Sequence, residues 1–106
     1  MEKPNYQLLL VSIAPNQATI LAELLVESKL AACVNIIPKI ESIYHWQGQI
    51  QHDKESLLLI KTTQAHYQEL EKIILQHHPY DIPEIISFDI SNGHENYLNW
   101  IYQSLT

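Results

Sequence analysis

A β-hairpin of unusual length is the sequence feature that most constrains the fold of this chain. Two runs rich in Val, Ile, Tyr and Trp cover residues 33–46 and 50–62, and Gly48 between them supplies the turn. Strands usually run about 5–6 residues, so the outer half of this hairpin extends beyond the rest of the chain. Because uncovered strand edges favour pairing with another chain, we expect the hairpin to build an oligomer, with Tyr44 and Trp46 as anchors near its tip.

Pro38 is expected to divide the first hairpin strand into a core part and a protruding part. Proline has no N–H group to donate to the ladder, so we expect a bend or an edge position there. The alternation of apolar residues predicts that one face of this strand carries Val34, Ile36, Ile40, Tyr44 and Trp46.

The segments outside the hairpin predict three helices and two further strands. The helices show apolar residues at helical spacing, and we expect Asn16, Thr63 and Asn92 to be their N-caps. In chain order, the predicted elements are a central strand at 7–13, a helix at 16–29, the hairpin, a helix at 63–78, a strand at 85–91 and a last helix that starts near residue 92.

This order, β-α-β-β-α-β with one helix appended, is typical of the ferredoxin-like α+β fold. We expect residues 1–106 to form a single domain. Right-handed crossovers place the first two helices on one face of an antiparallel sheet. The central strands are apolar on both faces, so we expect a partner subunit to cover the other face.

Composition argues against several classes of protein. Twelve acidic and six basic residues give a net charge of −6, which does not suit a nucleic-acid binder. No apolar run approaches the ~20 residues of a membrane span, so we expect no membrane partner. The single cysteine, Cys33, fits a reducing compartment, and we expect a cytoplasmic protein. With two glycines in the chain, Gly-rich phosphate loops are absent.

Five stretches together resemble the CutA family of divalent-cation tolerance proteins. They are LAACVNIIP at 30–38, SIYHWQG at 42–48, LLIKT at 58–62, HPYDIPEI at 78–85 and YLNW at 97–100. The stretches follow the order and spacing of the family and cover nearly the whole chain beyond its first residues. The resemblance implies a homotrimer similar in architecture to the PII-type signalling proteins, in which the long hairpins brace neighbouring subunits. It also implies a role in the response to metal ions, chiefly copper.

Cys33, His45 and His78 are the candidate metal ligands, because copper favours thiolate and imidazole groups. No Cys-x-x-Cys or His-Glu-x-x-His spacing occurs, so no single segment forms a site. Cys33 also fits a small buried apolar residue, and His45 a solvated strand residue that flanks the turn together with His52. We expect no required cofactor, with Cu²⁺ or another divalent cation as the candidate ligand.

The segment 78–84 is the main candidate for a binding site. Two prolines stiffen a short loop that carries an imidazole, a phenol and two carboxylates, although a plain connector between helix and strand fits as well. Lys61 needs a partner if it is buried, and Glu84 is the expected one. We expect a cleft between subunits that binds metal ions or a small anionic ligand and is lined by Tyr44, Trp46, Lys61, His78, Tyr80, Glu84 and Trp100.

Three functions are compatible with these features. The first is a homotrimeric divalent-cation tolerance protein that binds metal ions or a small ligand between its subunits. The second is a PII-like regulator that presents its hairpin tips to another protein. The third is a small enzyme with His78 or Glu84 as general base, Tyr80 as acid and Lys61 stabilising charge. Because no nucleophile or metal triad is visible, we expect a binding protein with no catalytic residue.

Overall fold

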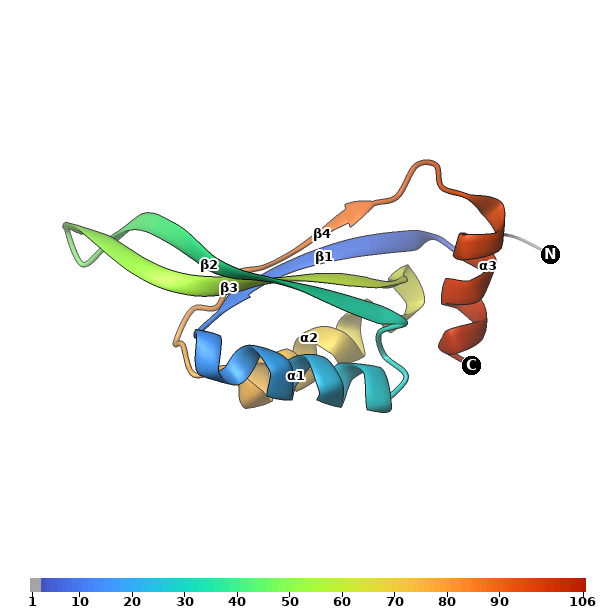
Figure 1. The fold of residues 1–106 in the computed structure, drawn as a ribbon, viewed down its shortest axis with the longest axis horizontal. Helices are drawn as coiled ribbons and strands as arrows, with labels where there is room; N and C mark the ends of the chain where they lie inside the picture. Colours follow the sequence, from blue (N-terminus) through green and yellow to red (C-terminus); the bar gives the residue numbers. More distant parts are fainter. Residues whose placement is uncertain (1–2) are drawn as a thin grey trace.

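The computed structural model describes residues 3–106 as a four-stranded antiparallel sheet with three α-helices (Figure 1). The order of the strands in the sheet is β2-β3-β1-β4, which confirms the predicted ferredoxin-like fold. In chain order, the elements are β1 (Tyr6–Ile13), α1 (Pro15–Glu27), β2 (Cys33–Trp46), β3 (Gln49–Thr63), the 3-10 helix η1 (Gln64–His66), α2 (Tyr67–His77), β4 (Ile85–Asp89) and α3 (Glu95–Ser104).

The hydrophobic core lies between the sheet and one layer formed by α1 and α2 (Figure 1). Alternate residues of β1, from Leu9 to Ile13, point into this layer and are fully buried. Leu58 and Ile60 join them from β3, opposite Val11 and Leu9. A smaller cluster fixes α3 to one end of the sheet through Tyr6, Ala32, Ile101 and Leu105.

The other face of the sheet is apolar, and neither α1 nor α2 covers it (Figure 1). Leu10 in β1 alternates with the core residues and lies opposite Leu59 in β3 and Ile86 in β4. Ile86 and its neighbour on the same face, Phe88, remain 45% and 49% exposed. Apolar side chains on both faces of the central strands were predicted, and the structure confirms them.

The hairpin of β2 and β3 is paired along its whole length, from Cys33 opposite Lys61 to Trp46 opposite Gln49. Gln47 and Gly48 form its two-residue turn with φ values of 51° and 79°. Two successive residues with positive φ match the right-handed twist of the strands. The predicted turn at Gly48 is therefore confirmed.

A β-bulge follows Pro38, where the pairing shifts between Ile37 and Ile40. Lys39 adopts a φ of 59° in this irregularity. The extra residue inverts the alternation, so Ile40, Tyr44 and Trp46 lie on the face opposite to Val34 and Ile36. The bend expected at Pro38 is confirmed, whereas the prediction that these five side chains share one face is wrong.

Two of the three predicted N-caps, Asn16 and Asn92, are wrong, whereas Thr63 is the N-cap of η1, the short helix that leads into α2. Helix α1 begins one residue earlier, with Ala14 as N-cap and Pro15 at its start, where the fixed φ of proline suits the first turn. The Thr63 side chain makes no capping bond to the backbone, and its hydroxyl pairs with His66 Nδ1 at 2.7 Å across η1. His94 precedes α3 as its N-cap. No helix of residues 3–106 is long and apolar enough to cross a membrane.

Candidate functional site

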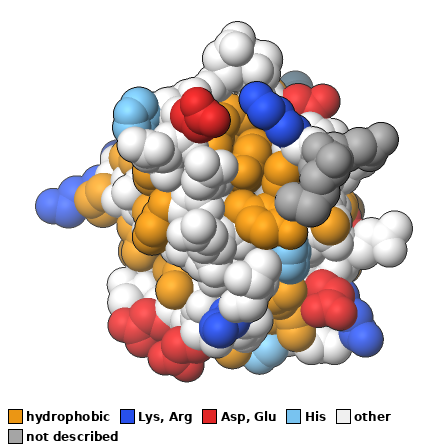
Figure 2. Space-filling model, turned by 90° about the vertical axis from the view of Figure 1, so that its right-hand side faces the viewer, with side chains coloured by type: hydrophobic (Ala, Val, Ile, Leu, Met, Phe, Trp, Pro, Cys, Tyr) orange, Lys and Arg blue, Asp and Glu red, His pale blue; other side chains and the backbone are white. Residues whose placement is uncertain are grey.

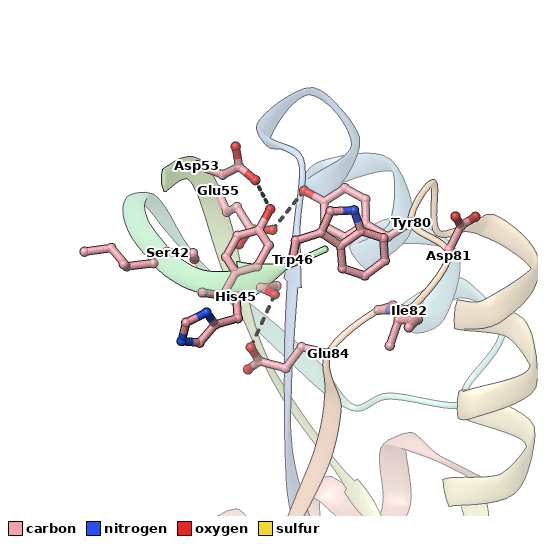
Figure 3. Close-up of a pocket in the computed structure, with 13 residues that line it drawn as sticks. Ser42, His45, Trp46, Asp53, Glu55, Tyr80, Asp81, Ile82 and Glu84 are labelled. Atoms are coloured by element: carbon pink, nitrogen blue, oxygen red, sulfur yellow. Dashed lines mark hydrogen bonds between the residues drawn. The ribbon is translucent and has the colours of Figure 1, made fainter. Parts of the chain in front are cut away.

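A cavity of about 820 Å³ lies between the outer half of the hairpin and the segment that joins α2 to β4 (Figure 3). Tyr44 and Trp46 reach it from β2, and Asp53 and Glu55 from β3. The segment 80–84 forms the other wall, and Ser12 at the end of β1 also contributes. The cavity therefore combines residues that lie far apart in the sequence.

The β-bulge is what directs the aromatic side chains of β2 into this cavity. Beyond the bulge, Ser42 lies opposite Asp53 and Tyr44 opposite Gln51, so Tyr44 and Trp46 share a face with Asp53 and Glu55. The Tyr44 hydroxyl donates a hydrogen bond to the Asp53 carboxylate (Figure 3). Without the extra residue, both aromatic rings would point to the helix-covered side of the sheet.

Tyr80 connects the loop wall to the hairpin wall. Its hydroxyl donates a hydrogen bond of 2.8 Å to Glu55 Oε2 (Figure 3). Burial raises the pKa of Tyr80 well above its ordinary value, and the hydrogen bond and negative charge of Glu55 add to this effect. The hydrogen bond to Asp53 likewise raises the pKa of Tyr44. Both phenols therefore hold their protons and act as hydrogen-bond donors.

His78 fixes the start of the segment 80–84 to the end of β1. Its Nε2 lies 2.7 Å from the carbonyl oxygen of Ser12, and its Nδ1 accepts a hydrogen bond of 3.2 Å from the Tyr80 N–H. Since a carbonyl can only accept, the proton of the ring is on Nε2. The ring is buried and packs edge-on against Tyr80, with 4.6 Å between the centroids. Both nitrogens are thus engaged within the protein.

The raised pKa of Tyr80 predicts a loss of stability in alkali. The folded chain holds the Tyr80 proton more tightly than the unfolded chain does. This proton therefore contributes fully to the free energy of unfolding below the ordinary tyrosine pKa of 10.0, and its contribution falls as the pH rises further. We expect Tyr80→Phe to make the free energy of unfolding less dependent on pH above this value. Urea unfolding at a series of alkaline pH values measures the slope, and an unchanged slope in the variant would contradict the assignment.

The expected ion pair between Lys61 and Glu84 does not form within the chain. Lys61 lies opposite Leu8, with Nζ 3.9 Å from Cys33 Sγ. Glu84 instead accepts a hydrogen bond of 3.5 Å from the Ser12 hydroxyl. Leu8 and Ser12 are four residues apart on β1, which is roughly 13 Å in a strand. The prediction failed because the two residues occupy opposite ends of the sheet.

Trp100 also lies away from the cavity. It belongs to α3 and stacks on Tyr97, with 5.6 Å between the ring centroids. Apolar side chains gather on the end of the molecule formed by this helix (Figure 2). Of the seven residues expected in the cleft, Tyr44, Trp46, Tyr80 and Glu84 line the cavity, His78 supports it, and Lys61 and Trp100 lie elsewhere in the protomer.

The candidate metal ligands do not converge within one chain. Cys33 and His45 are twelve positions apart on β2, a distance of roughly 40 Å along a strand. Within residues 3–106, no group of three or more His, Cys, Asp or Glu side chains is arranged to hold a metal ion. His45 and His52 share a face of the hairpin, at diagonal positions of the ladder.

Asp53 and Glu55 are the site residues that were missed in the sequence. They belong to a polar run in β3 that resembles an ordinary solvated strand. Glu55 is nevertheless only 4% exposed. With Asp81 and Glu84, they give the cavity four carboxylates and no lysine or arginine. This charge does not favour the anionic ligand that was expected.

Comparison with known proteins gives one consistent family. The family model of the CutA1 divalent ion tolerance protein matches residues 8–104. The divalent-cation tolerance protein CutA of Thermus thermophilus is 45% identical over 87 residues, which are 82% of this chain and 84% of that protein. The chloroplastic protein CutA of Arabidopsis thaliana is 48% identical over 84 residues, 79% of this chain, but these span only 46% of its own length.

Solved structures agree with the sequence comparisons. The crystal structure of CutA1 from Oryza sativa superposes with a TM-score of 0.93 at 38% identity, over 95% of this chain and 94% of that chain. The PII-like protein CutA from Nostoc in its apo form gives a TM-score of 0.89 at 28% identity, over 94% and 97% of the two chains. Both resemblances cover the long hairpin and the helices as well as the sheet.

Proposed function

The chain belongs to the CutA1 divalent ion tolerance family, and on that premise we propose that it is a homotrimer that serves divalent-cation tolerance by binding a cation or a small ligand in clefts between its subunits. The observation that carries this proposal is the uncovered apolar face of the sheet, which a monomer would expose to water. Two free sheet edges, β2 and β4, are available for contacts between subunits.

A metal site, in this proposal, takes its ligands from more than one chain. Cys33 and His45 lie at opposite ends of β2, so one chain cannot bring them to the same ion. In a closed ring of subunits, the hairpin tip of one chain reaches the body of the next. Copper is the proposed ion because imidazole and thiolate suit it. The single free thiol supports a reducing compartment, and we place the protein in the cytoplasm.

A copper titration of the purified protein by calorimetry tests this function. We expect saturable binding that is lost in Cys33→Ser or in His45→Ala, because thiolate and imidazole are the groups that copper favours. The control is His77→Ala, whose ring lies on the exposed side of α2 with Nδ1 2.9 Å from the Ile73 carbonyl. Weak binding that each histidine change reduces slightly would instead indicate incidental affinity of exposed imidazoles, and would contradict the proposed metal role.

The family is named for tolerance of ions and not for a reaction. The geometry gives little support to the acid–base enzyme that the sequence left open. Tyr80 holds its proton because its pKa is raised, which makes it a poor acid. Lys61 lies beside Cys33, away from His78 and Glu84. The four residues of that enzyme alternative therefore do not assemble within one chain.

The exposed hairpin tip supports a PII-like regulator as a second candidate. Ile43 and Ile50 lie on one face of the tip and are 59% and 61% exposed, although both are large apolar residues. Such a patch is typical of a surface that contacts another protein. In that role, a polar residue at Ile50 would weaken partner binding and leave copper binding unchanged.

A further inference from the structure

The charged side chains that line the hairpin cavity are all carboxylates, and His45 is the one histidine among the lining residues. Glu55 is buried, and the hydrogen bond that it accepts comes from the neutral hydroxyl of Tyr80. Residues 3–106 make one ion pair, Lys54 with Glu41 at 3.6 Å, and neither member lines the cavity. A buried carboxylate without a cation is unfavourable. The cavity thus lacks the positive charge that its walls would stabilise.

Three aromatic side chains surround the same carboxylates. Tyr44, Trp46 and Tyr80 are 40%, 40% and 38% exposed in the single chain, so substantial parts of their rings are free of contacts within that chain. Trp46 comes from the hairpin and Tyr80 from the opposite wall (Figure 3). Cations are attracted to the faces of aromatic rings, and organic ammonium ions are the ligands that such aromatic sites recognise.

A bare metal ion fits these walls poorly. It needs several oxygen, nitrogen or sulfur ligands around one point, and the described residues offer no group of three. Asp53 and Glu55 already accept hydrogen bonds from Tyr44 and Tyr80. At about 820 Å³, the cavity also has the size of a site for an organic molecule.

We propose that the cavity between the hairpin and segment 80–84 binds a small organic cation, an alkylated or methylated ammonium ion. The rings of Tyr44, Trp46 and Tyr80 would contact its apolar and charged surface, and Glu55 with Asp53 would balance its charge. This ligand class deepens the small-ligand part of the proposed function and rests on it. The ordered phenol–carboxylate hydrogen bonds keep both walls in place before the ligand arrives.

Titration of the 106-residue chain with tetramethylammonium chloride, followed by the NMR signal of the ligand, tests the site. Sodium chloride at equal ionic strength corrects for screening. We expect saturable binding, and an increase of about tenfold in Kd when Glu55→Gln removes the charge or Trp46→Leu removes a ring. Glu41→Gln, which removes an exposed carboxylate of the same hairpin outside the cavity, should leave Kd unchanged.

Absence of saturable binding to the wild-type protein would overturn the proposal, as would an equal Kd for wild type and Glu55→Gln. If a lysine of a neighbouring subunit fills the cavity, tetramethylammonium will not bind, and Glu55→Gln will weaken the assembly. That pair of results also overturns the proposal. Copper titration of the same samples separates the two claims. Copper binding without ammonium binding refutes the organic cation alone, whereas ammonium binding without copper binding supports it and refutes the metal role.

Discussion

Replacing Ile86 by Glu is expected to reduce the assembled protein to single chains. Ile86 lies in β4 opposite Leu10, on the apolar face that neither α1 nor α2 covers. In the proposed trimer this face is buried against the other subunits, so the new carboxylate would be removed from water without a partner. Such a burial costs several kcal/mol for each chain. Light scattering should show the molar mass falling from three times 12.3 kDa to the value for one chain.

Ile20→Glu provides the matched control for this experiment. Ile20 is the same residue type, but it lies on the outer side of α1 and is 69% exposed. We expect this variant to keep the mass of the wild-type protein. If Ile86→Glu also retains the full mass, the open face of the sheet is not the interface between subunits.

Replacing His78 by Ala is expected to lower the free energy of unfolding by about 2–4 kcal/mol. The change removes a buried ring together with its hydrogen bonds to the Ser12 carbonyl and the Tyr80 N–H. It also removes the edge-on contact with the Tyr80 ring. Urea unfolding at one fixed protein concentration measures the loss, since the stability of an oligomer depends on concentration.

His77→Ala is the control for this variant. The two histidines are adjacent in the sequence, but His77 is exposed at the end of α2. We expect its replacement to change the free energy of unfolding by less than about 0.5 kcal/mol. Similar losses in the two variants would show that His78 does not anchor the segment that follows it.

The architecture of the chain could be predicted because local patterns agree with the global fold. The nearly continuous apolar run of β1 and the helical spacing in α1 and α2 identify the elements, and their order then selects the ferredoxin-like sheet. The ends of the helices could not be predicted as well. Asn16 and Asn92 look like caps in the sequence, but Pro15 and His94 set the observed boundaries.

The face of the sheet on which each hairpin side chain lies could be determined only from the structure. Pro38 indicates an irregularity in the strand, but the sequence around it does not say how many extra residues the irregularity contains. One extra residue inverts every side chain that follows, which moves Tyr44 and Trp46 to the face of Glu55. Both aromatic residues line the cavity of the single chain, although their face of the strand was predicted wrongly. Their place in a cleft between subunits stays a prediction.

The residues that make up the site could likewise be predicted only in part from the sequence. Tyr80 and Glu84 lie in a stiff loop and were expected in a cleft between subunits; in the single chain they line the cavity. Lys61 and Trp100 were expected beside them, but their positions depend on the register of β3 and on where α3 packs. Glu55 was overlooked because burial of a charged strand residue is a property of the tertiary structure and leaves no local signal.

Light scattering of the wild-type protein during a copper titration tests the central claim most directly. We expect a constant mass of three times 12.3 kDa and binding that saturates at a fixed ratio of copper to chain. A mass of one chain, or copper uptake that rises without saturation, would contradict a trimer that binds cations in clefts between its subunits.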